Sequence, residues 1–165
     1  MNVTVIGSGN SGIAMAAHLS KEGNKVTLWN RSKATIAKLM ETHTIYCKGI
    51  INAKVKIDLI TNDLKKAVKN PDLILITTPA SSHKELAKQL AMCLKKETMI
   101  VLNPGRTFGA LEFQEIFKEW NPDLKQTIAE TQTIIYTCRR TSEDSVNIIS
   151  LKSDVLISTF DAAEN

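Results

Sequence analysis

The stretch Gly7-Ser8-Gly9-Asn10-Ser11-Gly12 has the spacing G-x-G-x-x-G. It follows the apolar run Val3–Ile6, a predicted buried strand, and opens the segment Asn10–Lys21, which has apolar residues at helical spacing. In this context Gly7 allows a sharp turn, Gly9 lets a pyrophosphate approach the backbone, and Gly12 lets the helix pack closely on the strand. The helix N-terminus then offers unpaired N–H groups and a positive dipole end to phosphates. We predict that all six residues contact a dinucleotide; an ordinary glycine-rich turn is the alternative.

The residues after the second predicted strand, Lys25–Asn30, bear on the choice of cofactor. An NAD site usually places Asp or Glu there to hold the ribose 2′-hydroxyl. This chain has Asn30, Arg31 and Ser32 instead. Arg31 can pair with a 2′-phosphate through its planar guanidinium, and Asn30 and Ser32 can add hydrogen bonds, whereas a carboxylate would repel that phosphate. We therefore expect NADP(H) to be favoured over NAD(H), unless Arg31 merely begins a solvated helix.

Composition and charge indicate one ordinary globular domain. The chain has 165 residues, which is enough for one domain with its own core, and we expect residues 1–165 to form a dinucleotide-binding domain. Its net charge is +4, but the lysines are dispersed rather than grouped. An anionic cofactor accounts for this mild basicity, and aromatic residues interleaved with Lys or Arg on one face are lacking, so no nucleic-acid partner is expected.

The cysteines and the apolar runs indicate a cytoplasmic protein. Cys47, Cys93 and Cys138 are an odd number without C-x-x-C spacing, so neither a metal site nor a disulfide is predicted, and reduced thiols fit better. We expect no membrane span because every apolar run is too short. The first residues lead directly into a strand, so we expect no signal peptide.

Alternation of strands and helices up to Trp120 predicts an α/β fold, a doubly wound Rossmann-type parallel sheet. We expect a strand order near 3-2-1-4-5-6 with helices on both faces. Short strands are also predicted at Ile45–Cys47 and Lys54–Leu59. Helices are absent between the later β-rich runs, so we expect antiparallel strands added at the C-terminal end of the sheet. These runs are Ile134–Arg139, Ser145–Leu151 and Asp154–Phe160.

Two further loops lie at the carboxyl ends of predicted strands. Asp72–Thr77 is nearly all apolar, as in a central parallel strand, and Thr98–Leu102 is the next strand. Ligands of open α/β sheets bind outside these ends. The expected cofactor contacts there are Thr77, Thr78, Pro79, Pro104 and Gly105, with simple turn chemistry as the alternative.

His83 lies in the first turn of the following predicted helix, on the side near the strand ends. A lone histidine in such a place is more often a surface or capping residue than a catalytic one. We keep it as a candidate substrate contact.

Two blocks in the second half carry a family resemblance. Asn103–Phe113 and Ala129–Arg139 resemble the octopine/nopaline (opine) dehydrogenase family, in the N-terminal NAD(P)-binding domain. The match extends from the glycine-rich loop to the terminal strands. Val26–Arg31 is also similar to glycerol-3-phosphate dehydrogenase, and the overall order is similar to ketopantoate reductase. The first half alone does not separate these families, so a cofactor domain of either kind is an alternative.

The resemblance implies an NAD(P)H-dependent reductive condensation of an amino acid with a 2-oxo acid. In that family a second, helical domain supplies most of the substrate site and a His–Asp pair for proton transfer. This sequence stops at Asn165, so we expect the helical domain to be absent and assign no catalytic residue. Arg106 or Glu130 could contact a substrate carboxylate or amine, or could brace loops.

The isolated chain is expected to bind cofactor without turnover. Apolar positions around Thr78, Pro104 and Glu130 would then lie open, so we expect self-association or association with a separate helical domain. A non-enzymatic NAD(P)-binding regulatory module is the rival interpretation. A regulatory module has no need for the two blocks that resemble opine dehydrogenases.

Overall fold

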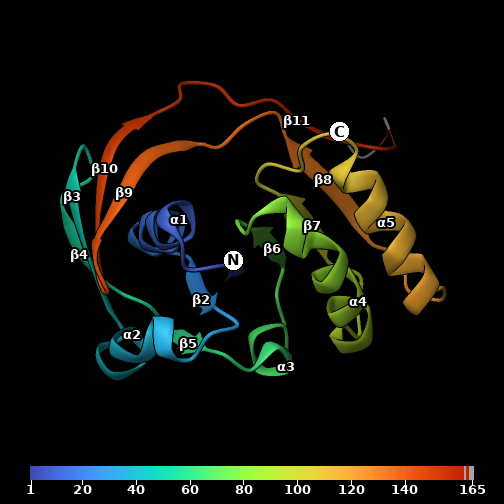
Figure 1. The fold of residues 1–165 in the computed structure, drawn as a ribbon, viewed down its shortest axis with the longest axis horizontal. Coiled ribbons are helices and arrows are strands. Elements are labelled where there is room, and N and C mark those ends of the chain that lie inside the picture. Colours follow the sequence, from blue (N-terminus) through green and yellow to red (C-terminus); the bar gives the residue numbers. More distant parts are fainter. Residues whose placement is uncertain (162, 164–165) are drawn as a thin grey trace.

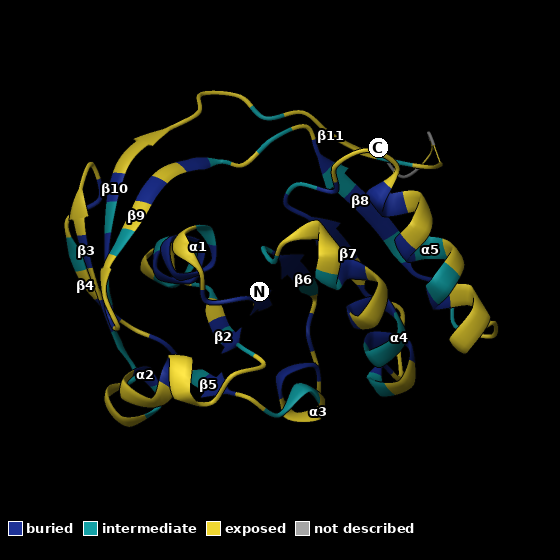
Figure 2. Cartoon of the chain, in the orientation of Figure 1, coloured by how far each residue is buried: buried dark blue, intermediate teal, exposed yellow. Residues whose placement is uncertain are grey.

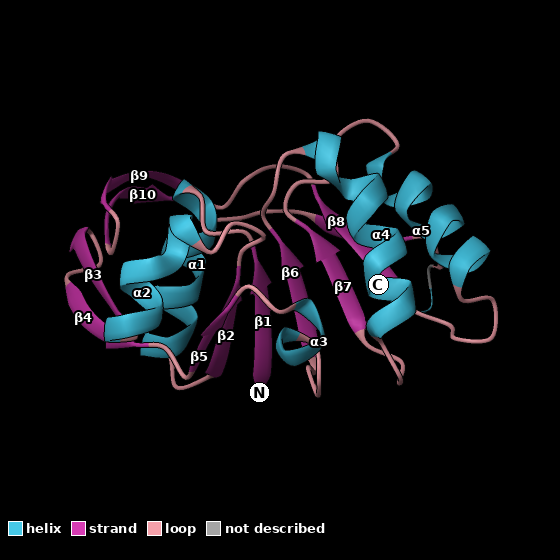
Figure 3. Cartoon of the chain, turned by 60° about the horizontal axis from the view of Figure 1, so that its bottom comes forward, coloured by secondary structure: helices cyan, strands magenta, loops and turns pink. Residues whose placement is uncertain are grey.

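A mainly parallel sheet forms the centre of the computed structural model, which describes residues 1–161 and 163. In spatial order its strands are β5 (Leu59–Thr61), β2 (Lys25–Trp29), β1 (Asn2–Ile6), β6 (Leu73–Ile76), β7 (Met99–Leu102), β8 (Thr127–Thr131) and β11 (Ile157–Thr159). The first six run parallel to their neighbours, and β11 pairs antiparallel with β8. The predicted order 3-2-1-4-5-6 is therefore confirmed, with β5 as the third strand and β1 in the interior (Figure 3).

Helices cover both faces of this sheet. One face carries α3 (Leu64–Ala67), α4 (His83–Cys93) and α5 (Gly109–Trp120), and the other carries α1 (Asn10–Lys21) and α2 (Ala37–Thr42). Short 3-10 helices, Ala34–Ile36 and Ala80–Ser82, precede α2 and α4. Phe113 and Phe117 of α5 are buried against the core that includes Ile76 and Leu102. No helix in the described residues is long and apolar enough to cross a membrane.

A second, four-stranded sheet covers the outer side of α1 (Figure 1). Its order is β4 (Ala53–Lys56), β3 (Thr44–Gly49), β10 (Ser145–Leu151) and β9 (Tyr136–Ser142). β10 pairs in parallel with β3, whereas β3 with β4 and β9 with β10 are antiparallel pairs. Strands from the first and last thirds of the chain therefore share one sheet.

Two strand predictions need correction. The sequence predicts that the strands after residue 134 extend the main sheet; β11 does so, but β9 and β10 join β3 and β4 in the second sheet. The sequence also predicts one strand over residues 54–59, which the structure divides between β4 and β5. The chain turns at Ile57 and Asp58, where Ile57 N–H bonds to the carbonyl of His43 and Asp58 accepts a hydrogen bond from Val26 N–H.

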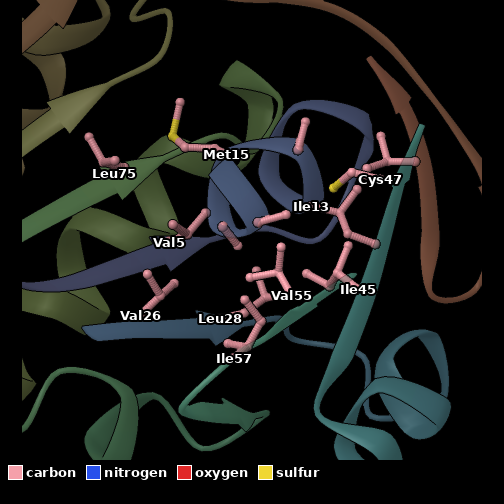
Figure 4. Packing of buried hydrophobic residues seen from close by; sticks show 14 of the residues in the cluster. Val5, Ile13, Met15, Val26, Leu28, Ile45, Cys47, Val55, Ile57 and Leu75 are labelled. Atoms are coloured by element: carbon pink, nitrogen blue, oxygen red, sulfur yellow. The ribbon is translucent and has the colours of Figure 1, made fainter. Parts of the chain in front are cut away.

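The second sheet is needed because α1 has no polar face over most of its length. Its residues from Gly12 to Ala17 are all buried, and much of α1 is dark blue in Figure 2. A helix that is apolar all round must be enclosed on all sides. Figure 4 shows Ile13 and Met15 packed among side chains of the central strands and of β3 and β4. Burial of each such side chain stabilises the fold by about 1.5–3 kcal/mol.

The three cysteines are free thiols. Cys47 and Cys138 lie in the core around α1, and Cys93 is half-buried at the end of α4. Burial raises the pKa of Cys47 to about 11, and it also raises the pKa of Cys138. Because the thiolate is the reactive form, these two buried cysteines are packing residues.

Candidate functional site: the carboxyl edge of the central sheet

The glycine-rich loop has the geometry that its sequence predicts. Gly7 has φ +105°, in the region that favours glycine, and a Cβ there would meet the Thr77 hydroxyl at 2.9 Å. A Cβ on Gly12 would overlap the carbonyl oxygen of Gly7, so the helix packs here only without a side chain. A Cβ on Gly9 would meet no described protein atom within 4 Å. The backbone at Gly9 thus borders open space, which is the place that a pyrophosphate requires.

The start of α1 leaves its N–H groups to a ligand. Gly9 is the N-cap residue and has no side chain to cap the helix, and the first turn contains no acidic residue. The N–H groups of a first helical turn have no partner within the helix. Asn10, Ser11 and Gly12 therefore present donors and the positive dipole end at the edge of the sheet.

The side chains of the same loop hold it in place. Ser8 is buried, and its hydroxyl accepts a hydrogen bond from Asn30 Nδ2 at 2.6 Å. Asn10 Oδ1 accepts one from the backbone N–H of Arg140 at 2.8 Å, and Ser11 hydrogen-bonds Cys138. Ser8, Asn10 and Ser11 were predicted as cofactor contacts. Their side chains face the protein, which leaves their backbone to face a ligand.

Arg140 of β9 was not predicted as a site residue, yet it fastens the loop. Its Nη1 donates to the carbonyl of Ser8 at 3.1 Å, and Nη2 donates to the carbonyls of Thr35 and Glu143. Its Nε donates to the carbonyl of Ser142 at 3.0 Å. The guanidinium thus joins the glycine-rich loop, the segment after β2 and the β9–β10 turn. No local sequence pattern indicates this contact, which exists only because the second sheet lies over α1.

The β9–β10 turn that supports Arg140 is itself held by an ion pair. Asp144 is buried, and its carboxylate lies 3.0 Å from Lys38 Nζ of α2. Burial works to raise the pKa of Asp144, but hydrogen bonds from Ser142 and Lys38, with the charge of Lys38, hold it below its usual value. The carboxylate therefore stays ionised and keeps α2 and the turn together.

A cavity of about 480 Å³ opens beside the glycine-rich loop. Five predicted cofactor residues line it: Gly7, Asn30, Arg31, Thr78 and Pro79. Its wall is completed by residues that were not predicted: Trp29, Ser81, Ser82, Glu85, Leu86 and Gln89. The volume lies within the range of about 300–1,000 Å³ that is typical of ligand pockets. Its place at the ends of β1, β2 and β6 is where an open α/β sheet binds the adenosine half of a dinucleotide.

At the end of β2, Arg31 is the residue left to meet a ligand. Asn30 Oδ1 accepts the N–H of Ser32, and the Ser32 hydroxyl accepts the N–H of Thr35. The predicted extra hydrogen bonds from Asn30 and Ser32 to a phosphate thus compete with bonds that hold the turn. Arg31 is exposed on the cavity rim, and its guanidinium has no hydrogen bond or ion pair within residues 1–161 and 163.

The threonines at the end of β6 take part in turn chemistry. Thr77 donates its hydroxyl hydrogen bond to the carbonyl of Ile6 at 3.0 Å, and the Thr78 hydroxyl accepts one from Ser82 at 2.8 Å. Thr78 and Pro79 still line the cavity, whereas Thr77 lies beneath Gly7. Thr77 therefore supports the glycine-rich loop from below.

His83 is a core residue, so the prediction of a surface or capping role is wrong. It is 1% exposed, and its Nε2 lies 3.2 Å from the carbonyl of Thr78. Burial lowers its pKa, so the ring is neutral, with the proton on Nε2 facing that carbonyl. Nδ1 has no partner in the described part of the chain and lies toward Gly109. His83 lines neither the 480 Å³ cavity nor the cavity beside Pro104 and Arg106.

The loop after β7 separates the predicted substrate residues. Glu130 Oε2 accepts the N–H of Ala110 at 3.2 Å, and its side chain occupies the space where Gly105 would carry a Cβ. Glu130 therefore braces the start of α5. Pro104 and Arg106 line a second cavity of about 350 Å³ together with Lys152. Glu130 does not line this second cavity.

Besides His83, two buried side chains at this edge have polar atoms without partners among the described residues. They are Trp29, through Nε1, and Asn103, through both Nδ2 and Oδ1. Neither was predicted as a site residue, although Asn103 lies in one of the blocks of the family resemblance. Among the same residues, no group of three or more His, Cys, Asp or Glu side chains could hold a metal ion.

A protein family and many curated relatives match this chain. The family described as NAD-dependent glycerol-3-phosphate dehydrogenase N-terminus matches residues 2–106. Opine dehydrogenase of Arthrobacter sp. (strain 1C) is 35% identical over 161 residues, which cover 97% of this chain and 45% of that enzyme. Glycerol-3-phosphate dehydrogenase [NAD(P)+] of Thermoanaerobacter sp. (strain X514) is 30% identical over 73% of this chain and 37% of that enzyme. The chain thus spans less than half the length of these relatives.

Solved structures share the fold at low sequence identity. Octopine dehydrogenase with NADH and L-arginine has a TM-score of 0.84 at 18% identity, covering 97% of this chain and 42% of that chain. Yersinopine dehydrogenase with NADP+ has a TM-score of 0.81 at 16% identity, covering 96% and 41%. A probable 2-dehydropantoate 2-reductase of Bacillus subtilis has a TM-score of 0.69 at 18% identity, covering 99% and 51%. The predicted Rossmann-type fold and the resemblance to opine dehydrogenases are confirmed.

Proposed function

This chain belongs to the family of the NAD-dependent glycerol-3-phosphate dehydrogenase N-terminus and is an NAD(P)-binding domain, and we propose that it serves an opine-dehydrogenase-like oxidoreductase. The observation that carries the proposal is the open backbone at Gly9 beside the 480 Å³ cavity. The choice of an opine-type enzyme is supported by the Arthrobacter relative, whose similarity continues beyond residue 106 through the second sheet.

The residues at the edge of the sheet fit a dinucleotide. The first turn of α1 would bind the pyrophosphate through its N–H groups, and the cavity beside Trp29 and Pro79 would hold the adenosine. The nicotinamide half would then extend toward Pro104 and Gly105. When bound, the cofactor supplies the hydride, and the residues of this chain bind and orient it.

We propose that the chain prefers NADP(H) to NAD(H). Arg31 is exposed at the cavity rim, and the position that usually carries the ribose-binding acid is Asn30. A guanidinium–phosphate pair contributes about 1.5–3 kcal/mol, which corresponds to roughly 10- to 100-fold in affinity.

Calorimetric titration of the chain with NADPH and NADH tests this preference. We expect Arg31→Ala to weaken NADPH binding by roughly 10- to 100-fold and to leave NADH binding almost unchanged. Lys33→Ala is the matched control, because Lys33 is an exposed cation of the same turn that does not line the cavity. Equal affinities of the native chain for both cofactors, or an equal loss in both variants, would contradict the proposal.

The substrate side of the proposed enzyme involves residues beyond this domain. We propose that the whole protein condenses an amino acid with a 2-oxo acid, that a helical domain supplies the proton-transfer residues, and that Arg106 lies near the substrate. The exposed apolar side chains Phe108, Ile134 and Ile157 support the idea that this side is covered by such a domain or by a second copy of the chain.

An activity assay tests whether this domain needs the proposed helical domain for turnover. With NADPH, pyruvate and a panel of amino acids, residues 1–165 are expected to bind cofactor without oxidising it, because both hydride and proton transfer need a positioned substrate. Substrate-dependent NADPH oxidation that is lost in Gly9→Asp would show that this domain is sufficient for turnover and would contradict the proposal.

A further inference from the structure

Asn103 is a buried carboxamide whose polar atoms are unused. Its side chain is 3% exposed, and neither Nδ2 nor Oδ1 has a hydrogen-bond partner in the described residues. Its backbone is ordinary, because its N–H bonds to the carbonyl of Ile76 and continues the β6–β7 ladder. Buried donors and acceptors are nearly always paired in native proteins. An amide with both groups unpaired therefore indicates a missing partner with one donor and one acceptor.

The strand register places Asn103 at the edge where the cofactor lies. Ile6 pairs with Ile76, and Ile76 pairs with Leu102. One residue further along these strands are Gly7, Thr77 and Asn103. The Thr77 hydroxyl lies beside Gly12 of α1. Because the backbone ladder continues at Thr77 and Asn103, alternation of side chains places Asn103 on the same side, opposite to Leu102. Asn103 is thus in one row with the glycine-rich loop and its supporting threonine.

Its neighbours in this row do not supply the missing partner. The Thr77 hydroxyl is bound to the carbonyl of Ile6, and the Thr131 hydroxyl on β8 is bound to the carbonyls of Leu102 and Thr133. Within residues 1–161 and 163, Asn103 is the member of the row whose side-chain polar atoms remain unpaired. The row therefore contains one amide at the end of β7, on the side away from the adenosine cavity.

We propose that Asn103 recognises the carboxamide of the nicotinamide ring. A carboxamide is complementary to another carboxamide, because each offers one N–H donor and one carbonyl acceptor in the same plane. The adenosine cavity lies at β2 and β6, so a dinucleotide that crosses the edge of the sheet places its nicotinamide toward β7. The proposal rests on the proposed cofactor binding and deepens it, since it assigns the residue that hydrogen-bonds the nicotinamide carboxamide.

The neighbouring loop must shift for this contact to form, because Asn103 is almost fully buried. Residues 104–108 form the segment beside it, in which Arg106 and Phe108 have positive φ and Phe108 is 75% exposed. Few internal contacts of Phe108 would be lost if this loop moved. Binding of the nicotinamide would exchange the buried, unpaired amide of Asn103 for a paired one.

Calorimetry with three ligands on the native chain tests the proposal. The ligands are NADPH, its 3-acetylpyridine analogue, in which a methyl group replaces the amide nitrogen, and 2′-phospho-ADP-ribose, which lacks the ring. We expect NADPH to bind about 10-fold more tightly than either of the others. Equal affinities for NADPH and the 3-acetylpyridine analogue would overturn the assignment without using any variant.

Asn103→Leu then identifies the residue. In this variant NADPH is expected to lose about 10-fold in affinity and to bind no better than the 3-acetylpyridine analogue, while 2′-phospho-ADP-ribose binds as before. Asn121→Leu is the matched control: Asn121 donates to the carbonyl of Ala91 at 2.8 Å, at the C-terminal end of α5. We expect this control to leave the affinity ratio between the ligands unchanged.

The outcomes distinguish this proposal from the proposed function. If the native chain binds 2′-phospho-ADP-ribose and NADPH, but Asn103→Leu weakens both alike or neither, the Asn103 assignment is wrong and cofactor binding stands. If the native chain binds neither ligand, both proposals fail. Asn103→Ser retains one hydroxyl, so its NADPH affinity is expected to fall between those of the native chain and Asn103→Leu. This second variant keeps the proposal testable if Asn103→Leu does not fold.

Discussion

The two halves of the sheet edge differ in how their polar side chains are used. At β1, β2 and β6, the side chains of Ser8, Asn30 and Thr77 all have hydrogen-bond partners inside the protein. At β7 and β8, Asn103 is buried without a partner in the described chain, and Phe108 is largely exposed. In the first half Trp29 Nε1 also lacks a partner among the described residues, but these three polar side chains are paired; in the second half both polar atoms of a buried amide are unpaired and a large apolar side chain is exposed.

This difference indicates a division of roles along one ligand. A preformed loop that is fixed by Arg140 and Asn30 loses little conformational entropy when phosphates bind, so it can supply most of the affinity. A half with unpaired groups can change its contacts when a ligand arrives. We therefore expect substitutions in the first half to change cofactor affinity, and most substitutions in the second to change stability or ring recognition.

The largest expected effect is in the first half, at Gly9. Asp at this N-cap position would stabilise α1, but its carboxylate would occupy the proposed pyrophosphate site. We expect Gly9→Asp to weaken NADPH binding by about 100-fold or more while the melting temperature stays equal or rises. Gly9→Asn is the control for side-chain size without charge. Loss of both folding and binding in Gly9→Asp would contradict the open space at this position.

Arg140→Gln probes how far the first half depends on its external support. The variant loses charged hydrogen bonds to three segments, so we expect a decrease of about 1.5–3 kcal/mol in the free energy of unfolding. NADPH affinity should fall by roughly 10-fold, because the loop at Ser8 is less fixed. The neighbouring Arg139 is exposed, so Arg139→Gln should change neither the free energy of unfolding nor the NADPH affinity. Chemical denaturation and calorimetry measure the two effects.

His83, at the start of the helix that follows β6, gives the fold a pH dependence of stability. Its pKa in the folded chain is lower than in the unfolded chain, because burial disfavours the charged ring. The unfolded state therefore binds the proton more readily, and stability is full above the ordinary histidine pKa and falls as pH drops below it. At about pH 5.5 the loss is at most about 1.4 kcal/mol. In denaturation measured from pH 7 to about pH 5.5, His83→Gln should remove this loss of stability. An unchanged pH profile in the variant would contradict the role assigned to His83.

The smallest effect is expected at Glu130. Its carboxylate caps the N–H of Ala110, and Glu130→Ala should therefore lower the free energy of unfolding by about 1 kcal/mol. Binding of 2′-phospho-ADP-ribose should not change, because this ligand occupies only the other half. Glu112→Ala removes an acid from the first turn of the same helix and serves as the control. A larger effect on ligand binding than on stability would show that Glu130 contacts the ligand. It would contradict the expectation that the first half alone binds 2′-phospho-ADP-ribose.

The order of the central strands could be predicted because its signals are local. The spacing of Gly7, Gly9 and Gly12 and the apolar run before them define a β-α-β unit without knowledge of the rest of the chain. The second sheet could not be predicted from the pattern of β9 and β10, which fits any antiparallel pair. A sign of it was present in α1, whose run from Ile13 to Ala17 leaves no polar face, so that a cover on both sides was required.

The candidate site was predicted where backbone geometry determines it and missed where tertiary contacts do. Gly7 and Gly12 behave as the motif requires. The roles of Arg140 and Asn103 depend on which strand lies over α1 and which hydroxyls are already bound, and neither is written in the local sequence. His83 was misjudged because its helical position did not indicate that the turn after β6 would bury it.

The parallel pairing of β10 with β3 has a consequence for synthesis on the ribosome. Ser145 pairs with Tyr46, so the cover of α1 is complete only after β9 and β10 have emerged. A nascent chain that ends before β9 would carry the glycine-rich helix with one apolar side open to solvent, and domains generally acquire structure as they emerge. The nucleotide site near residue 9 thus matures only after β9 and β10 have emerged, and the growing chain depends on these two strands to protect α1.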